Sequence, residues 1–214
     1  METKQQHKKR TQRGFTLVEM ITVLAIITLM TTAFVLNYRL ANQSRNLHTA
    51  ADEMASALRQ AQNLASTARA FPDNNGTVNV PKAYGVVIDK STNTYFLFAD
   101  RDGNGYYSNG TDDQKVGNDL SLTPGIQIAD FANSANPSNI EVDTNHIYVT
   151  FVPPIPQTLI FRDRPSGTPG SPRAVTQPPI LILLRIGTQD PSWKVVIDNV
   201  SGRISSDSYT PPAP

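Results

Sequence analysis

One carboxylate stands alone in an apolar stretch near the beginning of the chain. Glu19 is the single charged residue between Phe15 and Leu36, a run of 22 residues. A carboxylate inside a segment that otherwise suits lipid is energetically unfavourable, so it usually has a function and a cationic partner. Glu19 is therefore the first residue for which we seek a partner.

A second candidate for chemistry is the acidic stretch from Asp100 to Tyr106. Its sequence, Asp-Arg-Asp-Gly-Asn-Gly-Tyr, matches the first half of a calcium-binding loop, in which alternate oxygens converge on the cation and glycine permits a sharp turn. The closing glutamate is missing, because Thr111 stands at the twelfth position, but two aspartates follow it. An ordinary Asp/Asn/Gly turn explains the stretch equally well. The candidate calcium ligands are Asp100, Asp102, Asn104, Tyr106, Asp112 and Asp113.

No spacing of residues predicts catalysis. The three histidines, His7, His48 and His146, are far apart in the sequence, and none stands in a recognisable set with serine and aspartate. We interpret His146, next to an apolar stretch, as a residue at the edge of a strand. Three arginines in a region rich in proline and glycine are interpreted as part of a solvated loop: Arg162, Arg164 and Arg173. We therefore expect neither an enzyme nor a nucleic-acid partner.

The apolar run is long enough to cross a membrane. At about 1.5 Å per residue, a helix from Phe15 to Leu36 is roughly 33 Å long, which is enough to span the hydrocarbon layer of a bilayer. Twelve of its residues are Leu, Ile, Val or Phe, and together they favour insertion by about 4 to 7 kcal/mol. One charge near the centre costs roughly 2.5 to 3.5 kcal/mol, so we expect the segment to insert despite Glu19.

The residues before the run set its orientation. A basic flank stays in the cytoplasm, so everything after Leu36 is expected on the other side of the membrane. A cleaved secretory signal fits poorly, because the run is too long and Asn37-Tyr38-Arg39 follows it in place of a small-residue cleavage site. A plain signal-anchor helix explains these features equally well. The basic residues are Lys4, Lys8, Lys9, Arg10 and Arg13, against one acid, Glu2.

The junction between leader and run adds a specific pattern. The sequence from Arg13 to Glu19 joins a basic leader, a Gly-Phe junction and an acid at the fifth position after the glycine. It resembles the processing site of type IV prepilins and type II secretion pseudopilins. The resemblance implies that a membrane aspartyl peptidase cuts after Gly14 and methylates the new N-terminus at Phe15. It also implies that Glu19 pairs with the terminal amine of a neighbouring subunit during assembly.

Composition is consistent with an exported protein of one modest domain. The chain has 214 residues and a formal charge of +1, with 19 bases and 18 acids. Removal of the leader takes away five bases and one acid, which leaves 14 against 17, or −3. The sequence contains no cysteine, so disulfides and cysteine-bound metals are excluded. The exported domain must therefore be stabilised by its apolar core or by some cross-link other than a disulfide.

The sequence after Leu36 becomes amphipathic without a helix breaker. Neither glycine nor proline interrupts residues 15–70, which predicts one helix of about 56 residues, roughly 84 Å long. An apolar stripe could also indicate a coiled coil, although this one is rich in alanine and lasts only about four heptads. The stripe consists of Leu40, Leu47, Met54, Ala61 and Ala68, supplemented by Ala50, Ala51, Ala57, Leu58, Leu64 and Ala65.

From residue 77 onward the apolar pattern changes to a period of two, which is typical of strands. We predict a hairpin of 84–89 and 95–98, followed by strands at 125–129, 146–152, 158–161, 180–186 and 193–200. The predicted class is α+β: a long N-terminal helix packed on an antiparallel sheet, most simply as two small sheets, as in the pilin fold. The predicted divisions are a leader (1–14), a membrane and assembly helix (15–36), an amphipathic helix half (37–71) and a head domain (72–214).

The C-terminal half resembles minor pseudopilin H of type II secretion in two weaker motifs, Val149–Pro153 and Asp198–Ile204. The resemblance implies a minor pilin or pseudopilin in the bacterial cytoplasmic membrane, with its head periplasmic or extracellular. Its partners would be other pilin subunits, a prepilin peptidase and an inner-membrane assembly platform, in a filament for protein export. The alternatives are a minor type IV pilin for DNA uptake or adhesion, and a signal-anchored binding or enzyme domain.

Overall fold

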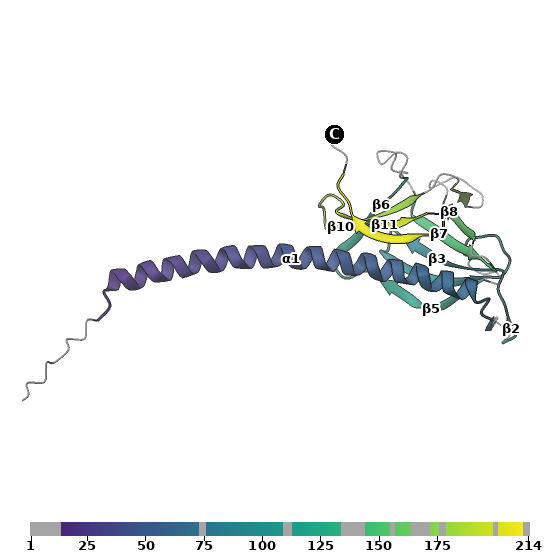
Figure 1. Ribbon diagram of the computed structural model, residues 1–214, viewed down its shortest axis with the longest axis horizontal. Coiled ribbons are helices and arrows are strands. Elements are labelled where there is room, and N and C mark those ends of the chain that lie inside the picture. Colours follow the sequence, from purple (N-terminus) through teal and green to yellow (C-terminus); the bar gives the residue numbers. More distant parts are fainter. Residues whose placement is uncertain are drawn as a thin grey trace, which may run out of the picture. The chain divides into compact units, whose positions relative to one another are not determined.

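One long helix, α1, spans Leu17–Ser66 in the computed structural model of the chain (Figure 1). The chain divides into a first unit, Met1–Asn42, and a second unit, Gln43–Pro214. α1 begins in the first unit and ends in the second. The structure describes residues 14–72, 76–108, 113–133, 144–154, 157–163, 172–175, 179–198 and 201–211.

Both ends of α1 have a local cause. At the start, the Oγ1 atom of Thr16 accepts the backbone N–H of Glu19 at 3.2 Å, which is the bond of a helix N-cap. At the end, Ala68 has a φ of 45°, its N–H donates to Ala65, and the next N–H donates to Leu64. These two bonds form a Schellman motif, which satisfies the last carbonyls and stops the helix. The predicted helix over 15–70 was therefore six residues too long, with two excess residues at the start and four at the end.

The strands form two antiparallel sheets and a small two-stranded ribbon. The larger sheet has six strands in the order β5-β4-β3-β7-β8-β9, the smaller has four in the order β12-β11-β10-β6, and β1 pairs with β2. The strands are β1 Phe71–Pro72, β2 Val78–Asn79, β3 Ala83–Asp89, β4 Thr94–Asp100, β5 Gln114–Ser121, β6 Ile126–Asn133, β7 His146–Val152, β8 Gln157–Arg162, β9 Arg173–Ala174, β10 Ile180–Ile186, β11 Trp193–Ile197 and β12 Ile204–Ser208.

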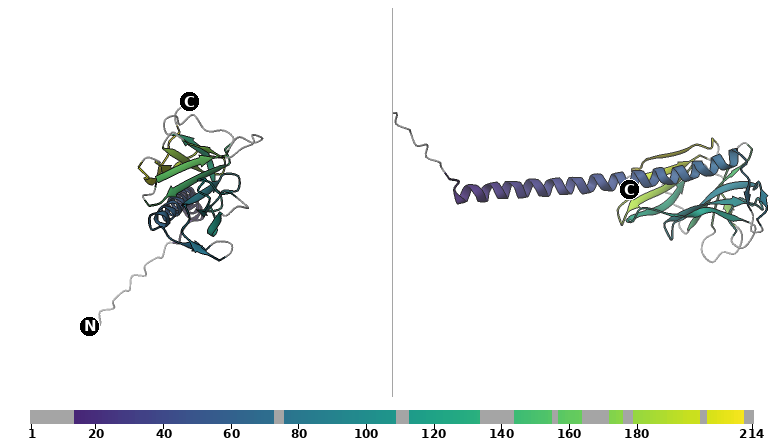
Figure 2. Two further views of the ribbon diagram at one scale, coloured as in Figure 1. Left: turned by 90° about the vertical axis from the view of Figure 1, so that its right-hand side faces the viewer. Right: turned by 90° about the horizontal axis from the view of Figure 1, so that it is seen from below.

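Within the second unit, one face of each sheet packs against α1. Figure 1 shows strands of both sheets beside this part of the helix, and Figure 2 shows the same packing from below. The helix contributes mostly alanines, whose small side chains let the strands approach closely, together with the larger Met54 and Leu58. The sheets contribute apolar residues such as Tyr84 and Ile182 to the same continuous core. The predicted α+β class is confirmed.

All seven predicted strands are present, but β6 continues four residues past its predicted end, and five further strands were not predicted: β1, β2, β5, β9 and β12. The predicted strand 193–200 ends at Ile197, because Asp198 opens a turn in which its carbonyl accepts the N–H of Gly202. β12 was missed because its sequence is mainly serine and aspartate. β5 was missed because it is an exposed edge strand whose ladder with β4 shifts register near Gly117, at a φ of 87°. Pairing with β4 therefore outweighs its weak propensity.

Leu58→Ala is predicted to lower the free energy of unfolding of the second unit by about 2 to 5 kcal/mol. The side chain of Leu58 is fully buried in the core, and its removal leaves a cavity between helix and sheets. Urea unfolding of the detergent-solubilised chain measures the change. Ser56→Ala, at an exposed position two residues earlier, should stay within about 0.5 kcal/mol of the wild type. Equal effects of the two variants would contradict this packing.

Candidate processing site and acidic loop

The predicted cleavage junction lies outside the helix. Gly14 and Phe15 precede the cap residue Thr16, and both are exposed. A Cβ atom added to Gly14 would meet no other atom within 4 Å. The described part of the chain therefore leaves space for a larger residue at this position.

Glu19 lies in the first turn of α1, at the third helical position. Thr16 and Glu19 occupy the two positions of a capping-box sequence, and a carboxylate near a helix N-terminus is favoured by the exposed N–H groups and the helix dipole. Among the described residues, Glu19 forms no ion pair within 4.0 Å. The first turn thus holds the carboxylate in place without supplying a cation.

The helix after Glu19 presents apolar side chains on all sides. α1 contains an 18-residue window with a mean hydropathy of 2.1, none of it buried within the structure. The threonines of the run do not leave their hydroxyls unpaired: Thr28, Thr31 and Thr32 each donate to a backbone carbonyl four residues earlier, at 2.7 to 2.8 Å. Internal pairing of polar groups is what a lipid environment demands. This segment fits a single-pass membrane anchor.

The prokaryotic N-terminal methylation motif matches the chain over residues 9–35. The N-terminal part of this chain is therefore type IV pilin-like. The matched segment contains Gly14, Phe15 and Glu19, so the predicted processing and assembly residues all belong to the motif. Comparison with curated proteins and with solved structures found no match for the chain. The likeness therefore rests on the N-terminal motif and the long helix behind it, and the head domain adds only its α+β layout.

The acidic loop of the head domain, Asp100–Ser108 together with Asp113, brings three predicted ligands together. Carboxylate oxygens of Asp100, Asp102 and Asp113 lie within 4.8 Å of one another. Asp100 and Asp113 are 1% and 5% exposed. Asp112 lies outside the described residues. Asn104 is close to the group through Asp102, since its side-chain amide donates to Asp102 at 2.7 Å.

Backbone N–H groups already bind these carboxylates. Asp100 accepts from Gly103 at 2.6 Å and from Gly105 at 2.9 Å, and Asp113 accepts from Arg101 and Ser108 at 2.9 Å each. The Oδ1 atom of Asn104 accepts the N–H of Tyr106, and no bond to the Tyr106 carbonyl is described. A carboxylate oxygen has a second lone pair, so these bonds leave room for a cation. The bonds also give a complete account of the turn without one.

The electrostatics of the loop favour a neutralising partner. Burial raises the pKa of Asp100 to about 6, and the charge of Asp113 adds to the rise although the N–H groups of Gly103 and Gly105 oppose it. Burial likewise raises the pKa of Asp113, with a contribution from Asp102. Like charges this close disfavour full ionisation of the group, which a proton or a cation would relieve. Calcium binding is compatible with this arrangement and stays a prediction.

The acidic loop also covers the outer face of the larger sheet. Gly105 has a φ of 84°, and a Cβ atom there would come within 2.3 Å of the Phe161 ring. Its carbonyl accepts the hydroxyl of the buried Thr150 at 2.7 Å. The following residues, Tyr106 and Tyr107, pack edge-on against aromatic rings of the sheet: Phe96, Phe98, Tyr148 and Phe161. The carboxylates therefore fix a loop that closes an aromatic cluster.

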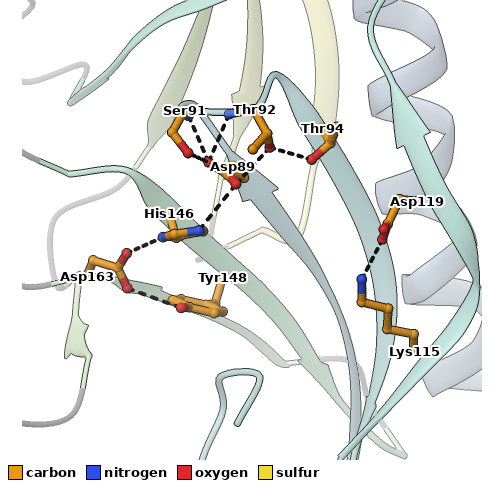
Figure 3. A network of polar contacts seen from close by, with 9 residues as sticks. All are labelled: Asp89, Ser91, Thr92, Thr94, Lys115, Asp119, His146, Tyr148 and Asp163. Carbon is orange, nitrogen blue, oxygen red and sulfur yellow. Dashed lines mark hydrogen bonds and ion pairs between the residues drawn. The ribbon is translucent and has the colours of Figure 1, made fainter. Parts of the chain in front are cut away.

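A polar network that the sequence did not predict lies at one end of the same sheet (Figure 3). His146, interpreted from sequence as a strand-edge residue, is the first residue of β7 and contacts both Asp89 and Asp163. Tyr148 donates its hydroxyl to Asp163 at 3.1 Å. The sequence held only a weak sign of this network. Asp89 ends one predicted strand, and Asp163 lies two residues after the end of another. The predicted solvated loop is wrong for two of its three arginines, because Arg162 ends β8 and Arg173 begins β9; Arg164 lies outside the described residues.

Calcium is predicted to raise the melting temperature of the solubilised full chain. A cation that binds only the folded loop stabilises it by about 2.7 kcal/mol at one hundred times the dissociation constant, and extracellular calcium sites bind at about 0.1 to 1 mM. Magnesium should substitute poorly, because it demands stricter octahedral geometry. Thermal melting with calcium, magnesium or chelator measures the effect.

The double variant Asp100→Asn/Asp102→Asn should lose the response to calcium. Asp119→Asn is the matched control, since Asp119 is an exposed acid on the neighbouring edge strand that pairs with Lys115. A melting temperature unmoved by millimolar calcium, or moved equally in the double variant, would show that the acidic loop is an ordinary turn.

Proposed function

We propose that this chain is a minor pilin or pseudopilin, a structural subunit and not an enzyme. It is cut after Gly14 by a prepilin peptidase and assembles through its N-terminal helix into a short filament for protein export. The observation that carries the proposal is the methylation motif at the start of a helix whose apolar side chains are exposed as far as Val35. Such a helix needs lipid or other helices around it.

Assembly in lipid requires an attraction other than the hydrophobic effect. Acyl chains are as apolar as leucine, so apolar side chains alone give helices little reason to associate. Cleavage after Gly14 would create an ammonium group at Phe15, at about the depth of Glu19. An ammonium and a carboxylate are each unfavourable in hydrocarbon, by roughly 2.5 to 3.5 kcal/mol for a central position. Pairing Glu19 with the N-terminus of a neighbouring subunit would relieve both.

The proposed location and partners of the chain follow from its basic leader and from its proposed role as a pilin subunit. The basic leader places the N-terminus in the cytoplasm and the head outside it, so the chain would be a single-pass protein of the bacterial cytoplasmic membrane. Its partners would be other pilin subunits, the prepilin peptidase and the inner-membrane assembly platform, with no nucleic acid.

The subclass is supported less strongly than the general role. The first weak motif of the minor pseudopilin H class is supported by β7, which ends at Val152 directly before the turn at Pro153. The second is supported by the turn from Asp198 to Gly202 that precedes β12. These features favour a type II secretion pseudopilin. A minor type IV pilin for DNA uptake or adhesion is the alternative within the same class, and a signal-anchored domain is the alternative outside it.

Processing is tested at the N-terminus. Mass spectrometry of protein from cells that express a prepilin peptidase should find a mature chain that begins with N-methylated Phe15. Gly14→Leu should remain full length in the membrane, whereas Gln12→Leu, two residues before the junction, should be processed. An intact leader in the wild type, or cleavage after the apolar run, would favour a signal anchor or a secretory signal instead.

Assembly is tested at Glu19. Glu19→Ala and Glu19→Gln should insert and be cleaved, because the apolar run already favours insertion. Cross-linking of both variants to neighbouring subunits should nevertheless fall at least about tenfold, which is equivalent to 1.4 kcal/mol. Glutamine, unlike alanine, suits the third helical position of a capping box, so the glutamine variant separates the loss of charge from the loss of helix capping. Met20→Ala, an exposed apolar change in the same turn, should assemble normally. Wild-type assembly of both Glu19 variants would exclude the amine–carboxylate pair.

A further inference from the structure

A carboxylate–imidazole–carboxylate row crosses three neighbouring strands of the larger sheet. Asp89 ends β3 and is in register with His146, the first residue of β7. Asp163 follows the last residue of β8, and its N–H donates to the carbonyl of His146 at 3.2 Å. Figure 3 shows the imidazole between the two carboxylates. The row therefore joins the ends of β3, β7 and β8.

Both ring nitrogens of His146 face an acid. Nδ1 contacts Oδ2 of Asp163, and Nε2 lies 3.5 Å from Oδ2 of Asp89. A neutral imidazole has one N–H and one lone pair, so it can donate to only one of them. The imidazolium form alone can serve both, which makes the complete row dependent on a proton.

The two carboxylates differ in how tightly they hold the ring. Asp163 makes the shorter contact and also accepts the hydroxyl of Tyr148, whose pKa is raised by burial and by Asp163, so that this donor keeps its proton. A neutral His146 would thus keep its N–H on Asp163 and turn a lone pair toward Asp89. The other charged groups nearby are Lys90, in the loop after β3, and Arg162, which ends β8.

Asp89 organises the loop that connects β3 to β4. It accepts the N–H and hydroxyl of Ser91 at 2.7 and 2.6 Å, and the hydroxyl of Thr92 at 2.7 Å. The same loop reaches the smaller sheet, because Lys90 pairs with Asp130 at 3.0 Å and the side-chain carbonyl of Asn93 accepts the N–H of Ile128 at 2.8 Å. Both contacts fall on β6. The loop therefore ties the two sheets together.

We propose that His146 is a proton-dependent latch that fastens the β3–β4 loop, and through it the β6 edge of the smaller sheet, to the end of β7. When His146 loses its proton, the link to Asp89 breaks, while the link to Asp163 persists. All groups involved lie in the second unit, so the latch does not depend on whether the chain assembles into a filament.

The sign of the pH dependence follows from the surroundings of His146. The hydrogen bond with Asp163 raises the pKa of His146, the charge of Asp89 adds to the rise, and burial opposes it. The latch is closed below the ordinary histidine pKa of about 6.5 and opens as pH rises through the higher value of the folded state. At low pH the group that matters is Asp89. Burial raises its pKa, but hydrogen bonds from Ser91 and Thr92 and the charge of His146 lower it by more. That carboxylate therefore stays ionised over the range in which His146 titrates.

Hydrogen exchange of the full chain in lipid nanodiscs tests the latch between about pH 5.5 and pH 8.5, on either side of the ordinary histidine pKa. After correction for the intrinsic pH dependence of exchange, peptides covering 89–94 and 126–133 should exchange roughly threefold or more faster at the higher pH. Peptides covering β8 and β10 should not change. The midpoint should coincide with the titration of His146, followed by NMR of the chain's three histidines.

Variants separate the latch from a merely structural role. His146→Gln should exchange at the fast rate at every pH, and Asp163→Asn should lower both the His146 midpoint and the exchange midpoint together. His48→Gln is the control, since His48 pairs with Asp52 on α1 and packs against Trp193 of β11; this variant should leave the response unchanged. Exchange that keeps its pH response in His146→Gln, or an exchange midpoint that stays fixed while the His146 midpoint moves, would overturn the latch.

Discussion

The burial of one alanine-rich face of α1 against both sheets is the constraint on which the head domain depends. The sequence has no cysteine, so no disulfide limits the unfolded chain, and the single continuous core must stabilise the fold. Alanines such as Ala50, Ala51 and Ala61 are completely buried there. A larger residue at these positions would push the helix away from the sheets. Truncation of Leu58 would instead leave a cavity in the core between the helix and the sheets.

Two polar loops add hydrogen bonds to the stability that the apolar core provides. The acidic loop bonds its own N–H groups to buried carboxylates and covers the outer aromatic cluster of the larger sheet. The β3–β4 loop bonds its own N–H groups to Asp89 and reaches across to β6 of the smaller sheet. In both loops a carboxylate substitutes for a covalent clip. Because these bonds end on carboxylates, the stability of both loops is expected to depend on protonation, whereas the helix-to-sheet core is apolar.

The same helix serves two environments with one backbone geometry. In its N-terminal part the side chains are exposed and apolar, and threonine hydroxyls return to the backbone. In its C-terminal part only one face is apolar, and polar residues beside it include Arg59, which donates to Ile204 of β12, and Gln62, which donates to Gly202 in the turn before that strand. Glu19 is the exception in the first part. The exposed run offers it no cation, which is why a partner from another subunit is the simplest explanation.

The sequence by itself determined the features that depend on neighbouring residues. The Gly14–Phe15 junction, Glu19 and the apolar run are contiguous, so the pattern alone identified the pilin-like N-terminus that the methylation motif then matched. Strong alternation predicted β3, β4, β7 and β10 within one or two residues. The helix end was misplaced because alanine favours helix at Ala68, and only the backbone bonds of the turn decide against it.

Tertiary structure decided whatever joins distant segments. β5 exists because β4 pairs with it, not because its own residues favour a strand. The sequence named Asp112 and Asp113 as acids that could join Asp100 and Asp102, and the return of the chain brings Asp113 to them. Asp89, His146 and Asp163 become neighbours only through the antiparallel register of β3, β7 and β8. Strand register depends on the burial of whole faces, so no local pattern could reveal this row.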